Sequence, residues 1–216
     1  MSSEFAWALQ GWPKKYISVN EINSFILPKR SRDSLNGYIK RGVSQGLLQK
    51  VINGHYIIIK NYNQKILNPY ELANSMDITS YISFQSALSL HGWIPEGVYA
   101  ITSATSKRSR KFFTKEIKFI YRKVPLVGIM VGVERFVEDD VTYLLATPWK
   151  AIADMYFFDK REWYSLKCLH LDLRIEYESF FESDLNILKE LSQVYGNLRV
   201  RKLLKKIYKE LIVYDK

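Results

Sequence analysis

The stretch Lys29–Ile59, KRSRDSLNGYIKRGVSQGLLQKVINGHYIII, decides the fold of the N-terminal part of the chain. Ser31 is a good helix N-cap, because its hydroxyl can accept a hydrogen bond from a backbone N–H of the first turn. After it, apolar or small residues recur at the spacing of one helix face: Leu35, Tyr38, Ile39 and Gly42. We expect Gly46 to end this helix, since glycine commonly adopts the left-handed conformation just past a helix C-terminus.

The opposite side of this predicted helix is polar and basic. Residues advance by about 100° each along a helix, so Arg32, Asn36 and Lys40, spaced by four, share that side, flanked by Asp33 and Arg41. These side-chain types read bases in DNA: arginine binds guanine in a bidentate manner, asparagine binds adenine, and lysine reaches guanine or phosphate.

Two apolar runs follow the helix, LLQKVI (47–52) and HYIII (55–59), on either side of Asn53-Gly54. Asn-Gly between apolar runs is the strongest short hairpin signal, because a type I′ turn needs positive φ at both central residues. The sequence therefore predicts a two-stranded hairpin directly after the helix.

The segment YISVNEINSFIL (16–27) precedes the stretch, and we expect a short extended run followed by another helix. In that helix Asn20 is the expected N-cap, Glu21 lies near the start, and three apolar residues face inward: Ile22, Phe25 and Ile26. The following PKR (28–30) breaks it. Helix, break, helix and hairpin is the order of a winged helix-turn-helix, whose second helix enters the DNA major groove.

Net charge favours the same interpretation. The 216-residue chain has a formal net charge of +10, and residues 1–66, 101–126 and 196–216 carry +7, +7 and +5, separated by acidic blocks. Strong positive charge favours nucleic acid or an anionic membrane surface as a partner. We predict DNA contacts at the following residues: Lys29, Arg30, Arg32, Asn36, Lys40, Arg41, Lys50, Asn53, His55, Lys60, Lys107, Arg108, Arg110 and Lys111.

Cysteine usage and hydropathy bear on the compartment. The single cysteine, Cys168, excludes an intramolecular disulfide and is compatible with a reducing cytoplasm. The N-terminus has no basic region followed by a long apolar run, and no segment approaches the roughly 20 apolar residues that span a bilayer. We expect a cytoplasmic protein without a membrane partner.

The best domain boundary is the Asn-rich segment around residues 60–70, which contains Pro69. We therefore expect an α+β chain with two domains: a winged helix-turn-helix in residues 1–66, and a mixed α/β domain with a helical C-terminal tail in residues 67–216.

The second domain alternates helical and extended patterns. Ser83 is expected to cap a helix through Leu90, closed by Gly92, and Pro148 to open another after Thr147. Apolar residues of the second helix share one face: Ala151, Ile152, Met155 and Tyr156. We expect strands in VYAITSA (98–104), EIKFIYRKV (116–124) and ERFVEDDVTYLLAT (134–147), the last with a turn at Asp139–Asp140, and a polar, basic loop in TSKRSRKF (105–112).

The tail is predicted to form two helices joined at Gly196. An apolar stripe on the second helix is expected to pack on the core: Val200, Leu203, Leu204, Ile207 and Leu211. Its polar side carries Arg201, Lys202, Lys205, Lys206 and Lys209, and three interpretations stay open: a solvated face, a nucleic-acid-binding face or a membrane-surface face.

Three segments follow the predicted winged helix in order: YISFQSALSLHGW (81–93), ITSATSKRSRKF (101–112) and ATPWKAIADMYF (146–157). With them, residues 15–160 resemble the AbiEi-type antitoxins, bacterial transcriptional regulators of type IV toxin–antitoxin systems. The resemblance implies repression of the chain's own operon through inverted repeats in its promoter. It also implies neutralisation of a nucleotidyltransferase-type toxin without a stable complex, and it places Lys107, Arg108, Arg110 and Lys111 in the family's basic loop.

An enzyme is not expected, and neither is a metal or another cofactor. The histidines His55, His91 and His170 are far apart and lack ligand-spaced neighbours, and no phosphate-binding glycine loop is present. Two alternatives remain: a winged-helix module that binds a protein and no specific DNA, and a metal-dependent nuclease. The nearest nuclease candidates are Asp77, Asp139, Asp140 and the Glu116–Lys118 pair.

Overall fold

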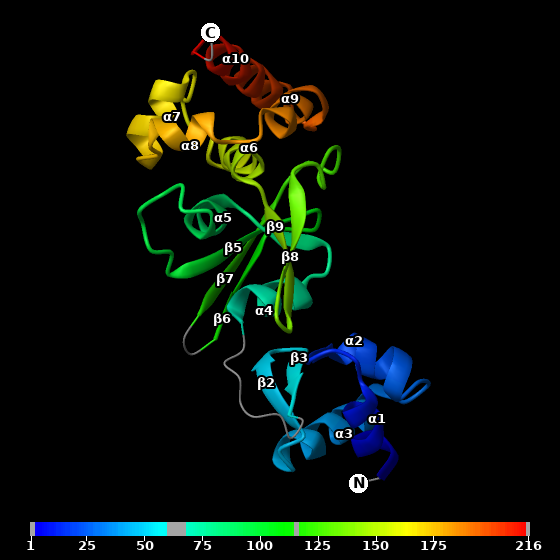
Figure 1. Cartoon of the computed structure of the whole chain (residues 1–216). Coiled ribbons are helices and arrows are strands. Elements are labelled where there is room, and N and C mark those ends of the chain that lie inside the picture. The colour runs from blue at the N-terminus through cyan, green and yellow to red at the C-terminus, as the bar shows by residue number, and fades with distance from the viewer. Residues whose placement is uncertain (1–2, 60–67, 115–116, 215–216) are drawn as a thin grey trace. The chain divides into compact units, whose positions relative to one another are not determined.

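The computed structural model describes residues 3–59, 68–114 and 117–214, and the chain has the expected mixed α+β composition (Figure 1). Contacts between residues divide it into two compact units. We call residues 1–68 with 113–115 unit 1, and residues 69–112 with 116–216 unit 2.

Unit 1 combines helices with a three-stranded antiparallel sheet of order β1-β3-β2. Its elements in chain order are α1 (Ser3–Gly11), β1 (Tyr16–Ser18), α2 (Val19–Glu21), the π-helix η1 (Ile22–Ile26), α3 (Arg32–Ser44), β2 (Leu48–Ile52) and β3 (His55–Ile58). Helix α1, which the sequence did not predict, contributes Phe5 and Leu9 to the core.

Helix α3 forms as predicted. The Ser31 hydroxyl accepts a hydrogen bond from the Ser34 backbone N–H, and Gly46 follows the helix with a positive φ of 70°. Leu35, Ile39 and Gly42 are buried. A Cβ added at Gly42 would lie 3.1 Å from the Leu48 side chain and 3.2 Å from the Phe5 ring, so a larger residue there would require these side chains to shift slightly.

The start of the preceding helix differs from the prediction. Ser18, and not Asn20, is the N-cap, and it forms a capping box with Glu21. Phe25, expected to face inward, is 71% exposed. The helix continues as a π-turn in which the Leu27 N–H donates to the Ile22 carbonyl. The extra residue in a π-turn shifts the helix face, which explains why Phe25 lies outside the core.

The hairpin is present, but its turn is not type I′. Gly54 has a φ of 82°, whereas Asn53 is not among the residues with positive φ. The β2–β3 register shifts between Lys50 and Ile52, so a bulge accommodates the turn that we had expected two left-handed residues to make.

Unit 2 contains a six-stranded sheet of order β6-β7-β5-β4-β9-β8. Its strands are β4 (Ser80–Ile82), β5 (Ala100–Thr105), β6 (Arg110–Phe113), β7 (Lys118–Lys123), β8 (Val133–Glu138) and β9 (Val141–Ala146). The sheet is mixed, since β5 pairs with β7 and β4 with β9 in parallel, while β4–β5 and β8–β9 are antiparallel. Phe119 and Tyr121 of β7 are buried. As predicted, β8 turns into β9 at Asp139–Asp140.

The helices of unit 2 are α4 (Pro69–Met76), α5 (Phe84–Leu90), α6 (Pro148–Asp159), α7 (Leu166–Leu173), α8 (Tyr177–Phe181), α9 (Leu185–Val194) and α10 (Leu198–Tyr214). Figure 1 shows α6 to α10 gathered at one end of the sheet. The predicted linker segment overlaps α4, because Pro69 opens that helix. None of the described helices is both long and apolar enough to cross a bilayer.

An ion pair lies in the core of unit 2. On α6 the Lys150 Nζ is 3.2 Å from the Asp154 Oδ1, and both side chains are buried. Hydroxyls of Tyr81, Ser83 and Tyr195 each donate to the Asp154 carboxylate at 2.9 Å. Burial and the Asp154 charge raise the pKa of Tyr81 and of Tyr195, which keeps both phenols protonated as donors.

We expect Asp154→Ala to destabilise unit 2 by about 3–5 kcal/mol, because the Lys150 ammonium would be left buried without a counter-ion. Lys150→Met should cost less, since Asp154 keeps its three hydroxyl donors. Urea unfolding of both variants measures the difference, with the exposed Lys160→Ala as the control. Equal losses for the two core variants would contradict this account.

Candidate nucleic-acid interface

The open side of α3 has two edges separated by a ridge of small or short side chains. At about 100° per residue, Gly37 lies roughly opposite the buried face, with Asp33 and Ser44 beside it. One edge carries Arg32, Asn36 and Lys40, which are all exposed. None of these three side chains bonds to another described residue, so all are available to a ligand.

The other edge carries Tyr38 and Arg41. The Arg41 guanidinium lies over the Tyr38 ring at 4.9 Å from its centroid, and that of Arg30, from the turn before α3, lies at 5.8 Å. Lys29 in the same turn is exposed and has a φ of 64°. This left-handed residue redirects the chain between η1 and α3.

The predicted wing residues lie on or beside the β2–β3 hairpin. Lys50 and Asn53 are exposed, whereas His55 is partly buried on β3, in register with Ser18 of β1. Lys60, the fourth predicted wing residue, lies outside the described residues.

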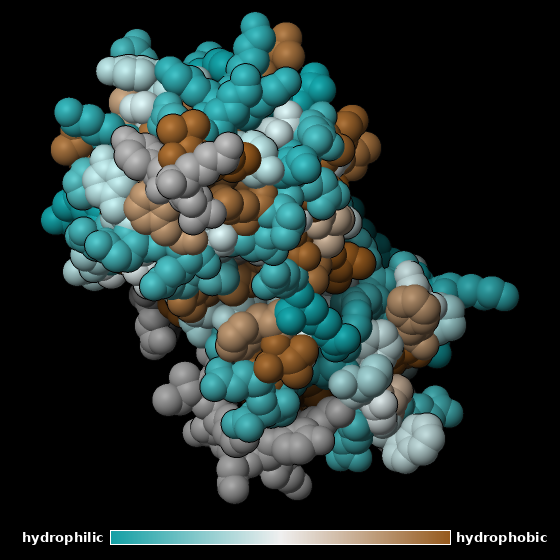
Figure 2. Space-filling view, turned by 45° about the horizontal axis from the view of Figure 1, so that its top comes forward, coloured by the Kyte–Doolittle hydropathy of each residue, from teal (hydrophilic) through white to brown (hydrophobic). Residues whose placement is uncertain are grey.

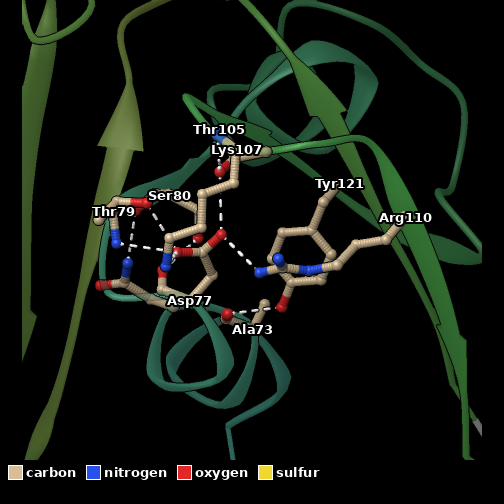
Figure 3. Close-up of polar contacts among 9 residues, drawn as sticks. Ala73, Asp77, Thr79, Ser80, Thr105, Lys107, Arg110 and Tyr121 are labelled. Carbon is tan, nitrogen blue, oxygen red and sulfur yellow. Dashed lines mark hydrogen bonds and ion pairs between the residues drawn. The ribbon is translucent and has the colours of Figure 1, made fainter.

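The predicted basic loop of unit 2 is only partly a loop, because β6 begins at Arg110. Figure 3 shows that Lys107 and Arg110 both point to Asp77, at the end of α4. The Lys107 Nζ is 3.0 Å and the Arg110 Nη2 is 2.6 Å from the Asp77 carboxylate, whose side chain is fully buried. Arg108 and Lys111 are exposed. Two of the four predicted cations are therefore held by a carboxylate, and two point to solvent.

The Asp77 carboxylate has no acceptor capacity left. Besides the two cations it accepts the Thr79 N–H, the Thr79 hydroxyl and the Thr105 hydroxyl, and a carboxylate offers about four lone-pair sites. Burial acts to raise the pKa of Asp77, but the hydrogen bonds from Thr79, Lys107 and Thr105 outweigh it, so the pKa lies below its ordinary value. Asp77 is therefore charged, and its role is structural: it holds together the residues that donate to it.

The other nuclease candidates do not join Asp77 in a described cluster. Asp139 and Asp140 form the β8–β9 turn, and Glu116 lies outside the described residues. In the part of the chain that the structure describes, no three histidine, cysteine, aspartate or glutamate side chains are arranged to hold a metal ion. His91 and His170 each bond a backbone carbonyl, of Ala146 and Ile175.

Helix α10 packs as predicted, with Val200, Leu203, Leu204, Ile207 and Leu211 buried. Arg201 bonds the Gln193 carbonyl, so it supports the α9–α10 connection. Four lysines form an exposed stripe: Lys202, Lys205, Lys206 and Lys209.

A cavity of about 370 Å³ lies elsewhere in unit 2 and is lined by residues including Trp93, Glu134, Trp149, Glu182 and Asp184. Among the described residues, none of those predicted to bind DNA lines it. On the face drawn in Figure 2, hydrophilic side chains cover most of the surface and apolar ones form separate patches.

We expect Asp77→Asn to destabilise unit 2 by about 1.5–3 kcal/mol at neutral pH, since hydrogen bonds to a charged group are lost. The folded-state pKa of Asp77 is lowered, so its stabilisation is complete above about pH 4, the unfolded value, and is lost as pH falls through the folded value. The stability gap between wild type and variant should therefore shrink in acid.

Urea unfolding near pH 7 and near pH 3 checks this expectation. The exposed Glu190→Gln substitution on α9 is the matched control and should show no gap at either pH. If the stability difference between wild type and Asp77→Asn persisted unchanged in acid, the assignment of Asp77 as a charged structural residue would be contradicted.

No protein-family model matches this sequence, and no curated protein matches it with significant similarity. The geometry and chemistry of the exposed side chains are therefore the guide to function.

Proposed function

We propose that unit 1 is a winged helix-turn-helix domain and that the protein is a DNA-binding transcriptional repressor. The observation that carries the proposal is the exposed edge of α3, where Arg32, Asn36 and Lys40 have no partner among the described residues while the face with Leu35, Ile39 and Gly42 is buried. Arginine and asparagine are the side chains best suited to read guanine and adenine in the major groove.

The arrangement of unit 1 supports this assignment. A helical segment (α2 with η1), a turn at Lys29 and then α3 give two helices in succession, the order in which the second helix enters the groove. The β2–β3 hairpin that follows would be the wing, and Lys50 and Asn53 are exposed on it for phosphate contact. Formal charges of +10 overall and +7 in residues 1–66 favour a polyanion.

We propose a binding role rather than catalysis. Asp77, the nuclease candidate that pairs with Lys107, has its lone pairs occupied. The alternative is a winged-helix module that binds a protein and no DNA. It would leave the edge with Arg32, Asn36 and Lys40 without the DNA bases that these side chains suit best.

We further propose that unit 2 serves as an antitoxin. This part rests on the resemblance of residues 15–160 to AbiEi-type antitoxins, which implies that the protein counters a nucleotidyltransferase-type toxin encoded beside it, without a stable complex. Unit 2 has a sheet and core of its own, which supports a second activity that does not depend on α3.

We expect Arg32→Ala and Asn36→Ala each to cost about 1–3 kcal/mol of binding to the upstream promoter region, with much smaller losses on random DNA. Gel shifts on both duplexes measure the difference, and the exposed Lys189→Ala substitution on α9 is the control. Equal losses on both duplexes would assign the two residues to phosphate contact. Absence of promoter binding by the wild-type protein would refute the repressor.

The two activities should separate in the full chain. We expect the Arg32→Ala/Asn36→Ala double variant to lose promoter repression and still rescue growth of cells that express the adjacent toxin. Reporter expression and growth curves check this. Loss of rescue in a variant that folds normally by circular dichroism would contradict an independent role for unit 2.

A further inference from the structure

One edge of α3 carries a cluster of Arg30, Tyr38 and Arg41, which we call the arginine–tyrosine cluster. The guanidinium carbons lie 5.8 Å and 4.9 Å from the centre of the Tyr38 ring, within the range of cation–π attraction. The Tyr38 ring packs in turn against Phe5 of the core, with ring centroids 5.6 Å apart. The core therefore anchors the ring, and the ring holds both arginines.

Gly37 lies beside the Arg41 guanidinium. A Cβ built at Gly37 would lie 3.7 Å from the Arg41 Nη1 and would meet no other group, so the Arg41 guanidinium lies beside bare helix backbone. Glycine inside a helix costs about 1 kcal/mol relative to alanine, and folding of α3 gains no packing contact from it.

Both arginines are exposed, and neither pairs with a carboxylate within the described ranges 3–59, 68–114 and 117–214. Two like charges held over one ring repel each other, and an anion placed between them removes that repulsion. Guanidinium groups match phosphate oxygens with paired N–H donors, and holding them in place beforehand reduces the entropy lost on binding.

We propose that the arginine–tyrosine cluster binds one phosphodiester of the DNA backbone, with Tyr38 as a positioning residue that acts through Arg30 and Arg41. The proposal rests on the proposed DNA-binding function. A helix is about 10–12 Å wide with its side chains and the major groove about 12 Å, so a helix in the groove has a phosphate strand along each edge. With the ridge around Gly37 toward the floor of the groove, Arg32, Asn36 and Lys40 reach base edges from one side, and the cluster faces the phosphate strand at the other side.

The test measures affinity for a random-sequence duplex against salt concentration, by fluorescence anisotropy of the full-length protein. The slope of log affinity against log salt changes by about 0.9 for each phosphate contact on duplex DNA. Tyr38→Leu should flatten the slope by about this amount and weaken binding to promoter and random DNA by the same factor. Tyr38→Phe keeps the ring and should behave as wild type.

Removing both arginines shows whether Tyr38 acts through them or only stabilises the fold. In an Arg30→Ala/Arg41→Ala background, which should itself show the flattened slope, Tyr38→Leu should have no further effect on the slope. Far-UV circular dichroism at the assay temperature verifies that each variant is folded.

An unchanged slope in folded Tyr38→Leu would overturn the cluster while leaving the repressor in place. If Tyr38→Phe weakened DNA binding as much as Tyr38→Leu does, the contact would belong to the Tyr38 hydroxyl, and the proposed cluster would be overturned too. Absence of DNA binding by the wild-type protein would overturn both the cluster and the repressor.

Discussion

The burial of one face of α3 is the constraint on which the arrangement of unit 1 depends. Leu35 and Ile39 enter the core formed with Phe5, Leu9 and Leu48, and Gly42 packs closely against Leu48 and Phe5. Once that face is buried, the helix period places the remaining side chains outward. The orientation of the proposed DNA-reading edge is therefore a consequence of apolar packing on the other side of the same helix.

The two buried carboxylates of unit 2 have a comparable organising effect. Asp154 connects α6 to β4 through Tyr81, and to the end of α9 through Tyr195. Asp77 ties the end of α4 to the β5–β6 segment through Lys107 and Arg110. An unpaired buried charge is costly, so these contacts restrict the packing to arrangements in which each carboxylate meets its donors.

The charge distribution of the surface follows from which side chains are buried and which are paired. The sequence has a basic block in residues 101–126, yet Asp77 neutralises part of it and leaves Arg108 and Lys111 exposed. On α10 the apolar stripe is buried, so the lysines of the opposite side form an exposed row that makes no ion pair with the described residues. Counting charges along the chain therefore overstates the exposed positive charge of residues 101–126, whereas it describes that of α10 well.

Local sequence patterns were enough to predict several features. Spacing and turn chemistry predicted the Ser31 cap, the face and end of α3, the β2–β3 hairpin, the β8–β9 turn and the α9–α10 pair. Three other features emerge only in the folded structure: the π-turn that exposes Phe25, the pairing of Lys107 and Arg110 with Asp77, and the burial of Lys150 with Asp154. For the two buried carboxylates the physical reason is distance along the chain. Asp77 lies about thirty residues from its cations, and Asp154, although only four residues from Lys150, lies more than forty from Tyr195. Folding alone brings these distant partners together.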